Sequence, residues 1–263
     1  MRFKIADMIL EFQGDPDMES SALWDLFRTD ETQSPHYRIL RRYCTELPQC
    51  AEGHYFYDGV QECHYAMSRE VGNQLELLIP ERLAPWGSKI HQLYELMALP
   101  HVLLQEQRLV IHASYIAHEG YGMIFTAPSG TGKSTQADLW QKYRNAEILN
   151  GDRGVIGMRE EEPYVFGFPM SGSSEYCVNR SLPLRCIVSL KQAPENRIRR
   201  LTGREALRVI LNGTYADPKH PGDFSRSMNV AISLLQTPVF ELSCLPNVGA
   251  VEALEQALEQ LTP

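Results

Sequence analysis

The stretch from Ile124 to Trp140, IFTAPSGTGKSTQADLW, constrains this 263-residue chain more than any other. An apolar run, Gly122–Ala127, is followed by a loop with glycines at 130 and 132 and then by a segment that can form a helix from about Lys133 to Tyr143. Glycine permits backbone angles that let a loop turn its N–H groups inward, and a helix N-terminus attracts anions. The stretch therefore predicts a strand, a phosphate-binding loop and a helix, in that order.

Each position of the motif GxxxxGK[ST] has a chemical task. Lys133 would reach the β- and γ-phosphates of a nucleotide, and the Ser134 hydroxyl would hold Mg²⁺. The first glycine of the motif is replaced by Ala127, a position that accepts a small residue if its φ is negative. The alternative interpretation is a glycine-rich turn with a surface lysine. We predict that the following residues bind the nucleotide: Ser129, Gly130, Thr131, Gly132, Lys133, Ser134 and Thr135.

A carboxylate follows one helix and one short strand after the loop. In EILNGDRGVI, Asp152 comes directly after the apolar strand predicted for Glu147–Asn150. A carboxylate in this position could reach Mg²⁺ directly or through water. The alternative is a turn residue, since Asn-Gly-Asp is also turn chemistry. We predict that Asp152 is a metal ligand.

A histidine precedes the loop by one strand. The strands predicted for Leu109–Ala117 and Gly122–Ala127 are joined by a tight turn. If the two strands pair antiparallel, His112 lies beside the glycine loop. The alternative is a core histidine within an apolar run. His112 is therefore a candidate catalytic residue.

These pieces, in this order, resemble a known family. His112-Ala113, the loop Pro128–Thr135 and Gly151-Asp152-Arg153 resemble the HPr kinase/phosphorylase catalytic domain and its relatives. That group includes the ATP-using phosphoenolpyruvate carboxykinases, the kinases of lasso-peptide clusters and free-serine kinases. The similarity runs from about Leu104 to the C-terminus. It implies a mixed α/β fold with an HPr kinase/PEP carboxykinase-like P-loop catalytic domain, and ATP- and Mg²⁺-dependent phosphoryl transfer.

The resemblance also implies roles for single residues. Lys133 and the amides of residues 130–133 would hold the ATP phosphates, while Ser134 and Asp152 would bind Mg²⁺. His112 would line the acceptor side and help to place the transferring phosphoryl group. Arg153 would neutralise phosphate charge, although a strand-end surface arginine is an equally simple interpretation.

Two departures from the family pattern bear on catalysis. Relatives carry two adjacent acids, of which the first is the proposed general base, but here that position is Gly151. His112 or Glu175 could substitute for it, or the chain could bind nucleotide without catalysis. The family's downstream signature is replaced by GFPMSGSSEYCVN, which argues against HPr as the acceptor. This loop is either structural or a binding surface, and its candidate substrate residues are Ser173, Ser174 and Glu175.

Composition excludes some functional classes. The formal net charge is −8 and the pI is near 5.5, so the chain is a poor candidate for binding nucleic acid or anionic membranes. It has no run of 18 apolar residues, and its N-terminus becomes acidic too early for a signal peptide. The six cysteines form no CxxC pair, which favours reduced thiols over a metal site or a disulfide framework. We expect a cytoplasmic protein.

A domain boundary is predicted near residues 100–108. It rests on a proline, a polar QEQR stretch and a change in the residue pattern along the chain. Residues 1–104 would form a strand-rich region that supplies acceptor specificity, and residues 105–263 would form the catalytic domain. Apolar spacing predicts a helix over Ser88–Leu99 that ends at Pro100, and Pro183–Leu190 is the best candidate for a buried strand. The basic run Arg197–Arg200 is interpreted as a solvated turn leading into a helix; the alternative is a segment that covers the phosphates or contacts an acidic peptide.

The sequence thus predicts a kinase that transfers the γ-phosphoryl group of ATP to a hydroxyl of a small molecule or of a peptide serine. Two alternatives remain open. One is a non-catalytic or regulatory nucleotide-binding protein, which the glycine at 151 favours. The other is a phosphotransferase that uses another phosphate donor, such as pyrophosphate or phosphoenolpyruvate. The sequence also leaves a homo-oligomer open.

Overall fold

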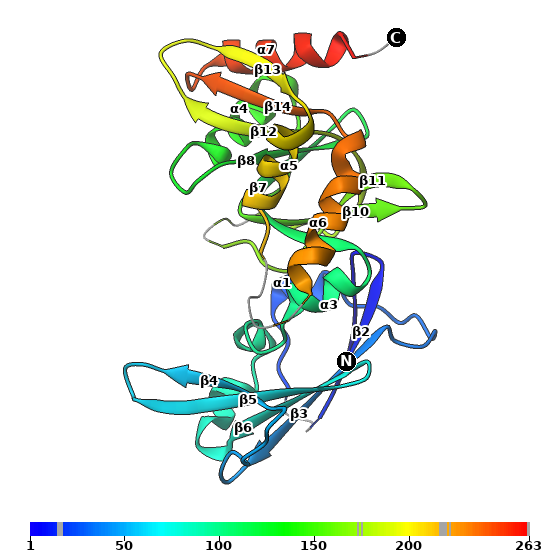
Figure 1. The fold of residues 1–263 in the computed structure, drawn as a ribbon, viewed down its shortest axis with the longest axis vertical. Helices are drawn as coiled ribbons and strands as arrows, with labels where there is room; N and C mark the ends of the chain where they lie inside the picture. Colours follow the sequence, from blue (N-terminus) through cyan, green and yellow to red (C-terminus); the bar gives the residue numbers. More distant parts are fainter. Residues whose placement is uncertain (15–17, 173, 175, 216–219, 221, 262–263) are drawn as a thin grey trace. The chain divides into compact units, whose positions relative to one another are not determined.

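A computed structural model of the chain describes residues 1–14, 18–172, 174, 176–215, 220 and 222–261 (Figure 1). The chain divides into two compact units, Met1–Val102 and Leu103–Pro263. Each unit is built around one sheet that contains both parallel and antiparallel strand pairs. The predicted mixed α/β class is confirmed at this level.

The first unit holds a six-stranded sheet in the order β1-β2-β3-β6-β5-β4. Its strands are β1 (Arg2–Ile5), β2 (Met8–Gln13), β3 (Tyr37–Cys44), β4 (His54–Asp58), β5 (Cys63–Val71) and β6 (Gln74–Pro80). The pairs β2–β3 and β3–β6 are parallel and the remaining neighbours are antiparallel. The core includes Trp24 of α1 (Ala22–Asp25), whose ring meets the edges of Phe3 and Phe12.

The helix predicted for Ser88–Leu99 is wrong. That region contains a 3₁₀ turn, η2 (Ile90–Leu93), and then a separate helix, α3 (Leu99–Gln105). Ala98 has a positive φ of 47°, and this left-handed residue interrupts the helical path between the two elements. Pro100 stands in the first turn of α3, where a helix needs no N–H from it. The proline thus begins a helix instead of ending one.

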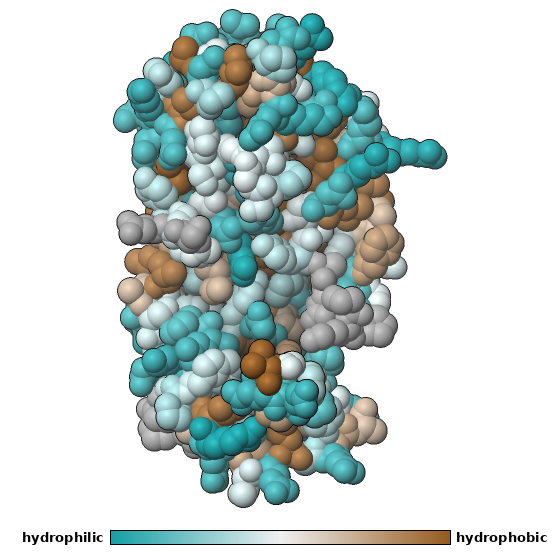
Figure 2. Space-filling model, turned by 90° about the vertical axis from the view of Figure 1, so that its left-hand side faces the viewer, coloured by the Kyte–Doolittle hydropathy of each residue, from teal (hydrophilic) through white to brown (hydrophobic). Residues whose placement is uncertain are grey.

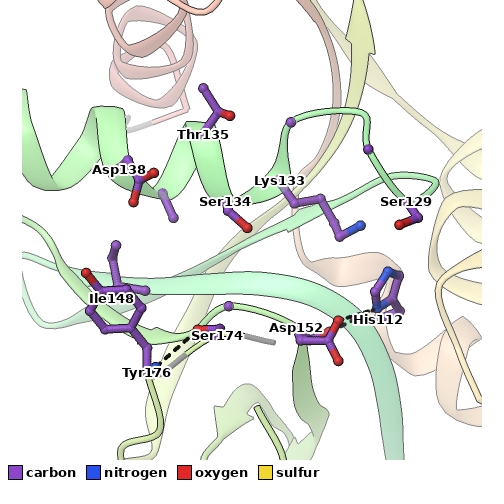
Figure 3. A pocket seen from close by; sticks show the side chains of 14 residues that line it. His112, Ser129, Lys133, Ser134, Thr135, Asp138, Ile148, Asp152, Ser174 and Tyr176 are labelled. Atoms are coloured by element: carbon purple, nitrogen blue, oxygen red, sulfur yellow. Dashed lines mark hydrogen bonds and ion pairs between the residues drawn. The ribbon is translucent and has the colours of Figure 1, made fainter. Parts of the chain in front are cut away.

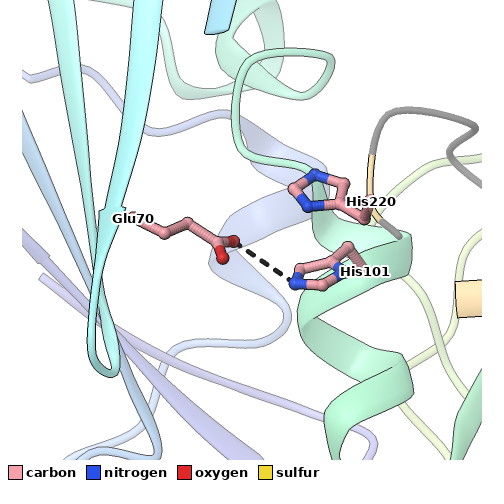
Figure 4. A group of neighbouring side chains, drawn as sticks. All are labelled: Glu70, His101 and His220. Carbon is pink, nitrogen blue, oxygen red and sulfur yellow. Dashed lines mark ion pairs between the residues drawn. The ribbon is translucent and has the colours of Figure 1, made fainter. Parts of the chain in front are cut away.

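Polar side chains connect α3 with the sheet of the first unit. Nε2 of His101 lies 3.4 Å from Oε1 of Glu70, near the end of β5 (Figure 4). The Tyr37 hydroxyl of β3 donates to the same oxygen at 3.0 Å. Burial raises the pKa of Tyr37, and the Glu70 carboxylate raises it further, so the phenol stays protonated and remains a donor. Two further short elements, η1 (Glu81–Leu83) and α2 (Ala84–Gly87), follow β6.

The second unit holds an eight-stranded sheet in the order β11-β10-β7-β8-β12-β14-β13, with β9 paired to β7. Its strands are β7 (Arg108–His118), β8 (Tyr121–Thr126), β9 (Glu147–Asn150), β10 (Arg153–Arg159), β11 (Glu162–Phe166), β12 (Leu182–Gln192), β13 (Arg197–Leu201) and β14 (Val239–Cys244). The pairs β8–β12 and β12–β14 are parallel. The antiparallel pairing of β7 with β8 aligns Ala113 with Thr126, as the tight turn predicts.

Helices cover both faces of this sheet. They are α4 (Lys133–Arg144), α5 (Gly203–Asn212), α6 (Asp223–Ser233), which continues into η3 (Leu234–Gln236), and α7 (Val248–Glu259). Successive residues of a strand point to opposite faces. Phe125 of β8 therefore belongs to one core with Trp140 of α4, while the preceding Ile124 belongs to the other core with Ile210 of α5. The sheet is buried on both sides, and its central strand β8 delivers the glycine loop at its end.

The interpretation of Arg197–Arg200 as a turn is wrong, because these residues form the edge strand β13. Strand β13 pairs antiparallel with β14. Arg199 forms ion pairs with Glu241 of β14 at 3.0 Å and with Glu205 of α5 at 2.9 Å. Charged side chains are a common way to keep an edge strand from pairing with other chains. The basic run therefore lies at the sheet edge, and none of its residues lines the cavities beside the glycine loop.

The exposed surface mixes polar and apolar side chains, and the face drawn in Figure 2 shows both kinds interspersed. Among the residues that the structure describes, no helix combines the length and the apolar character needed to cross a bilayer. All six cysteines are free thiols.

Candidate functional site

A cavity of about 780 Å³ opens where β8 ends and α4 begins (Figure 3). Side chains of α4 line one wall, and residues from β7, β9 and the segments after β9 and β11 line the other. The lining residues are His112, Ser129, Gly130, Gly132, Lys133, Ser134, Thr135, Ala137, Asp138, Ile148, Gly151, Asp152, Ser174 and Tyr176. Residues that the sequence singles out from four separate segments are thus brought to one cavity.

The glycine loop, Pro128–Gly132, has the backbone that its sequence predicts. Gly130 has a φ of 76°, and Gly132, the N-cap of α4, has a φ of 114°. Residues with a side chain rarely adopt such angles. Ala127 is not among the described residues with a positive φ, which explains why alanine is accepted there. The loop is closed by a hydrogen bond from the N–H of Thr131 to the carbonyl of Pro128 at 3.3 Å.

Lys133 reaches back along the loop. Its side chain is only 8% exposed in spite of its charge. Nζ donates to the carbonyls of Ala127 at 3.1 Å and of Pro128 at 3.4 Å. An ammonium group has three N–H donors, so one remains for an anion in the cavity. Burial lowers the pKa of Lys133, and the nearby Asp152 carboxylate partly opposes this by favouring the charged form.

Asn150 holds Asp152 in place. Its Oδ1 accepts the backbone N–H groups of Asp152 at 3.0 Å and Arg153 at 3.1 Å. Its Nδ2 donates to the carbonyls of Met170 at 2.9 Å and Phe168 at 3.3 Å. The side chain is fully buried, so these four bonds are made out of contact with water. Asn-Gly-Asp is therefore a turn built on the asparagine, and the same turn presents the Asp152 carboxylate to the cavity.

Asp152 has a cation or a donor beside each carboxylate oxygen. Nδ1 of His112 lies 3.3 Å from Oδ1 and 3.1 Å from the backbone carbonyl of Asp152. Nε of Arg153 lies 3.2 Å from Oδ2. Since Nδ1 of His112 faces two acceptors, we assign its proton to that nitrogen, which leaves Nε2 as the acceptor in a neutral ring. The register of β7 and β10, which aligns His112 with Arg153, produces this arrangement.

Tyr215 supports the same cluster and was not predicted from the sequence. Its ring lies edge-on to His112, with centroids 6.3 Å apart, and the Arg153 guanidinium stands over it at 5.1 Å. A single tyrosine after α5 carries no sequence signal of such a role. Arg153 is absent from the described residues that line the cavity, because its side chain lies between Asp152 and Tyr215.

Gly172 leaves room for the Asp152 carboxylate. A Cβ on Gly172 would lie 2.5 Å from Cγ and 2.8 Å from Cβ of Asp152, and its φ is +58°. Gly172→Ala is therefore expected to lower the free energy of unfolding by about 2 kcal/mol, through backbone strain at this φ and collision of the new Cβ with Asp152. It should also lower any Asp152-dependent turnover by about 100-fold through misplacement of the carboxylate. Urea unfolding and steady-state rates measure the two effects.

Gly120 offers a matched control for that substitution. It also has a positive φ, of +83°, but a Cβ there would meet nothing within 4 Å. Gly120→Ala should lower stability by about 1 kcal/mol, from the backbone alone, and leave turnover unchanged. If both alanine variants kept full turnover, the close packing of Gly172 on Asp152 would have no functional role.

Ser174 occupies the space beside Gly151. A Cβ on Gly151 would lie 2.6 Å from Cβ of Ser174, so a larger side chain at 151 requires the serine to move. The Ser174 hydroxyl accepts the N–H of Tyr176 at 3.1 Å, and the Gly151 carbonyl accepts the Ser114 hydroxyl at 2.8 Å. The other two residues predicted for the substrate side, Ser173 and Glu175, lie outside the described residues.

The donor set of the cavity fits a hard divalent cation. Ser134 and Asp152 come from opposite walls (Figure 3) and offer a hydroxyl and a carboxylate oxygen, the ligand types that Mg²⁺ prefers. Asp138 also lines the cavity, and burial raises the pKa of its carboxyl group. Asp138 and Tyr176 were not singled out from the sequence, since an acid on a helix and an aromatic residue in a loop are common on any surface.

Comparisons with known proteins show a likeness to solved structures. No protein-family model matches the chain, and no curated protein matches it. Among solved structures, the HPr(Ser) kinase/phosphatase from Coxiella burnetii matches with a TM-score of 0.38 and 10% sequence identity, over 59% of this chain and 99% of that chain. At this TM-score and identity, the likeness carries no argument about the activity or substrate of the present chain.

Proposed function

We propose that the second unit is an ATP- and Mg²⁺-dependent kinase that transfers the γ-phosphoryl group to a hydroxyl of a small molecule or of a peptide serine. One observation carries the proposal: Lys133 on one wall and Asp152, paired with His112, on the other line a single cavity at the N-terminus of α4. Phosphoryl transfer depends mostly on positioning and on charge stabilisation, and this cavity offers both.

The loop and Lys133 would bind the phosphates. The N–H groups at the start of α4 and the helix dipole favour an anion there. Lys133 brings a buried positive charge with one remaining N–H donor. Its electrostatic attraction for a phosphate is stronger where water is excluded. When bound, Mg²⁺ would neutralise phosphate charge, and Ser134 and Asp152 are the residues that would hold it.

His112 would serve as the proton acceptor that position 151 lacks. With its Nδ1 hydrogen bonded to Asp152, Nε2 can accept the proton of the attacking hydroxyl. The hydroxyl oxygen then forms the new bond to phosphorus as the bond to the β-phosphate oxygen breaks, and ADP leaves. A positioned base contributes about 10²–10⁴-fold. Asp152 orients the ring and stabilises its protonated form, as the acid does in other acid–histidine pairs.

The packing at Gly151 leads to a prediction about the missing acid. Gly151→Asp is expected to lower stability by about 1–3 kcal/mol, because its Cβ collides with Ser174, and to leave transfer no faster. The double variant Gly151→Asp/Ser174→Gly should recover most of this stability. Urea unfolding of both single variants and the double variant measures the coupling. A Gly151→Asp protein of unchanged stability and about 100-fold higher rate would instead show that a base fits beside Ser174.

The experiment that tests the proposed function is incubation with γ-labelled ATP and Mg²⁺ in the presence of pools of amino acids, sugars or serine-containing peptides. We expect the label to move to one pool, which identifies the acceptor class. Pyrophosphate and phosphoenolpyruvate, offered as donors in parallel, test the alternative phosphotransferase. ATP that binds without label transfer to any pool, and without hydrolysis, would contradict catalysis and favour a regulatory nucleotide-binding protein.

A further inference from the structure

A second cavity, of about 410 Å³, shares the glycine loop with the first. Gly130, Gly132 and Thr135 line both cavities. From there the second cavity extends along the ends of β12 and β14, whereas the first extends toward Asp152. Beyond the loop and α4, its walls are formed by Leu190, Gln192, Ala193, Cys244, Leu245 and Pro246. The loop therefore has open space in two directions.

The two cavities differ in charge. The first contains Lys133, Asp138 and Asp152, while the described residues that line the second include no charged side chain. Leu245 leaves 36% of its surface exposed, although it is a large apolar residue. An uncharged cavity with apolar walls suits a flat, largely apolar group far better than a phosphate.

A buried acceptor also points to a ligand in the second cavity. Gln136 of α4 lines this cavity and is only 2% exposed. Its Nε2 donates to Sγ of Cys244 at 3.4 Å, while its Oε1 has no hydrogen-bond partner among the described residues. Buried polar atoms normally have partners. A ligand that brings an N–H or O–H donor would supply the missing one.

We infer that the second cavity binds the nucleoside end of the phosphate donor, an inference that rests on the proposed function. The transferable phosphoryl group must lie in the first cavity, where Asp152 and His112 are. A nucleotide held by the loop amides then has its other end at Thr135, which both cavities share. The base lies against the apolar wall that includes Leu245, and an amino group of the base or a ribose hydroxyl donates to Oε1 of Gln136.

The test separates nucleoside binding from phosphate binding. Ala193→Trp should fill the second cavity, and Glu195→Trp is its matched control, since Glu195 is an exposed residue of the same loop outside the cavity. Calorimetry would measure the Kd of each protein for ATP and for inorganic tripolyphosphate. We expect Ala193→Trp to weaken ATP at least about tenfold, the loss of roughly 1.4 kcal/mol, with tripolyphosphate binding and both Glu195→Trp values unchanged.

Each other outcome has a distinct meaning. Unchanged ATP binding by Ala193→Trp would overturn the nucleoside site while leaving the proposed function intact. Equal weakening of ATP and tripolyphosphate would also overturn it, because the cavity would then not be separate from the phosphate site. If neither ligand binds the parent protein, the proposed function itself fails.

Gln136→Leu tests the hydrogen bond to the buried acceptor. Two analogues of ATP each lack one possible donor: purine riboside triphosphate lacks the amino group of the base, and 2′-deoxy-ATP lacks a ribose hydroxyl. The parent protein should bind one of the two about tenfold more weakly than ATP. Gln136→Leu should remove that difference, which a purely structural role of Gln136 would not do. A preference that survives the substitution would exclude Gln136 as the acceptor.

Discussion

Lys133→Met is expected to abolish the stabilisation of the protein by ATP. Charge-assisted hydrogen bonds to phosphate contribute roughly 3 kcal/mol, so the Kd for ATP should rise about 100-fold or more. The side chain is almost fully buried on the loop, and methionine preserves most of its volume. Thermal unfolding with increasing ATP measures the effect, because a ligand that binds only the folded state raises Tm with its concentration.

The matched control for this variant is Lys142→Met, which removes an exposed lysine from the same helix. It should keep the full ATP-induced rise in Tm. A Lys133→Met protein that responds to ATP as the control does would refute phosphate binding by this lysine.

Without ligand, Lys133→Met should be at least as stable as the parent near neutral pH. Burial lowers the pKa of Lys133 from its ordinary value of 10.5, so the charged form is disfavoured in the folded protein. Between the lowered pKa and 10.5 the unfolded chain binds more protons, and the parent therefore gains stability as pH rises through this window. The advantage of the variant should shrink accordingly in urea unfolding followed from neutral to alkaline pH.

Asp152→Asn is expected to lower the rate of Mg²⁺-dependent transfer by about 10²–10⁴-fold, the range for loss of a positioned charged or proton-transferring group. The substitution removes a carboxylate that would hold the metal and that also orients His112. Metal-free ATP binding should stay unchanged or become tighter, since one negative charge beside the phosphates is lost. Steady-state kinetics at varied Mg²⁺ and calorimetry in a chelator separate the two quantities.

Asp138→Asn is the control for this change. Asp138 lines the same cavity from α4, and burial raises the pKa of its carboxyl group, so the variant tests loss of an acid that has no contact with His112. We expect less than about a tenfold effect on the rate. Equal rates for Asp152→Asn and the parent would remove Asp152 from the site.

Local sequence patterns predicted the elements around the cavity closely. The strand before the loop, the helix that starts at Lys133 and the short strand β9 all follow from apolar runs and glycines that act over a few residues. The same reasoning failed at Ser88–Leu99, where the apolar spacing reflects burial of several short segments. It also failed at β13, because a basic edge strand has the composition of a solvated turn.

The sequence by itself determined the loop, since Gly130 and Gly132 allow positive φ angles in any surroundings. It also marked His112, Lys133 and Asp152 as candidate site residues. Only the tertiary structure decided which of these groups meet. The pairing of β7 with β10 sets His112 against Asp152. The buried Asn150 amide anchors the turn at Asp152 by donating to the distant carbonyls of Phe168 and Met170. Ser174 fills the space beside Gly151. Such contacts join residues far apart in the chain, and no local preference encodes them, because they follow from strand register and packing.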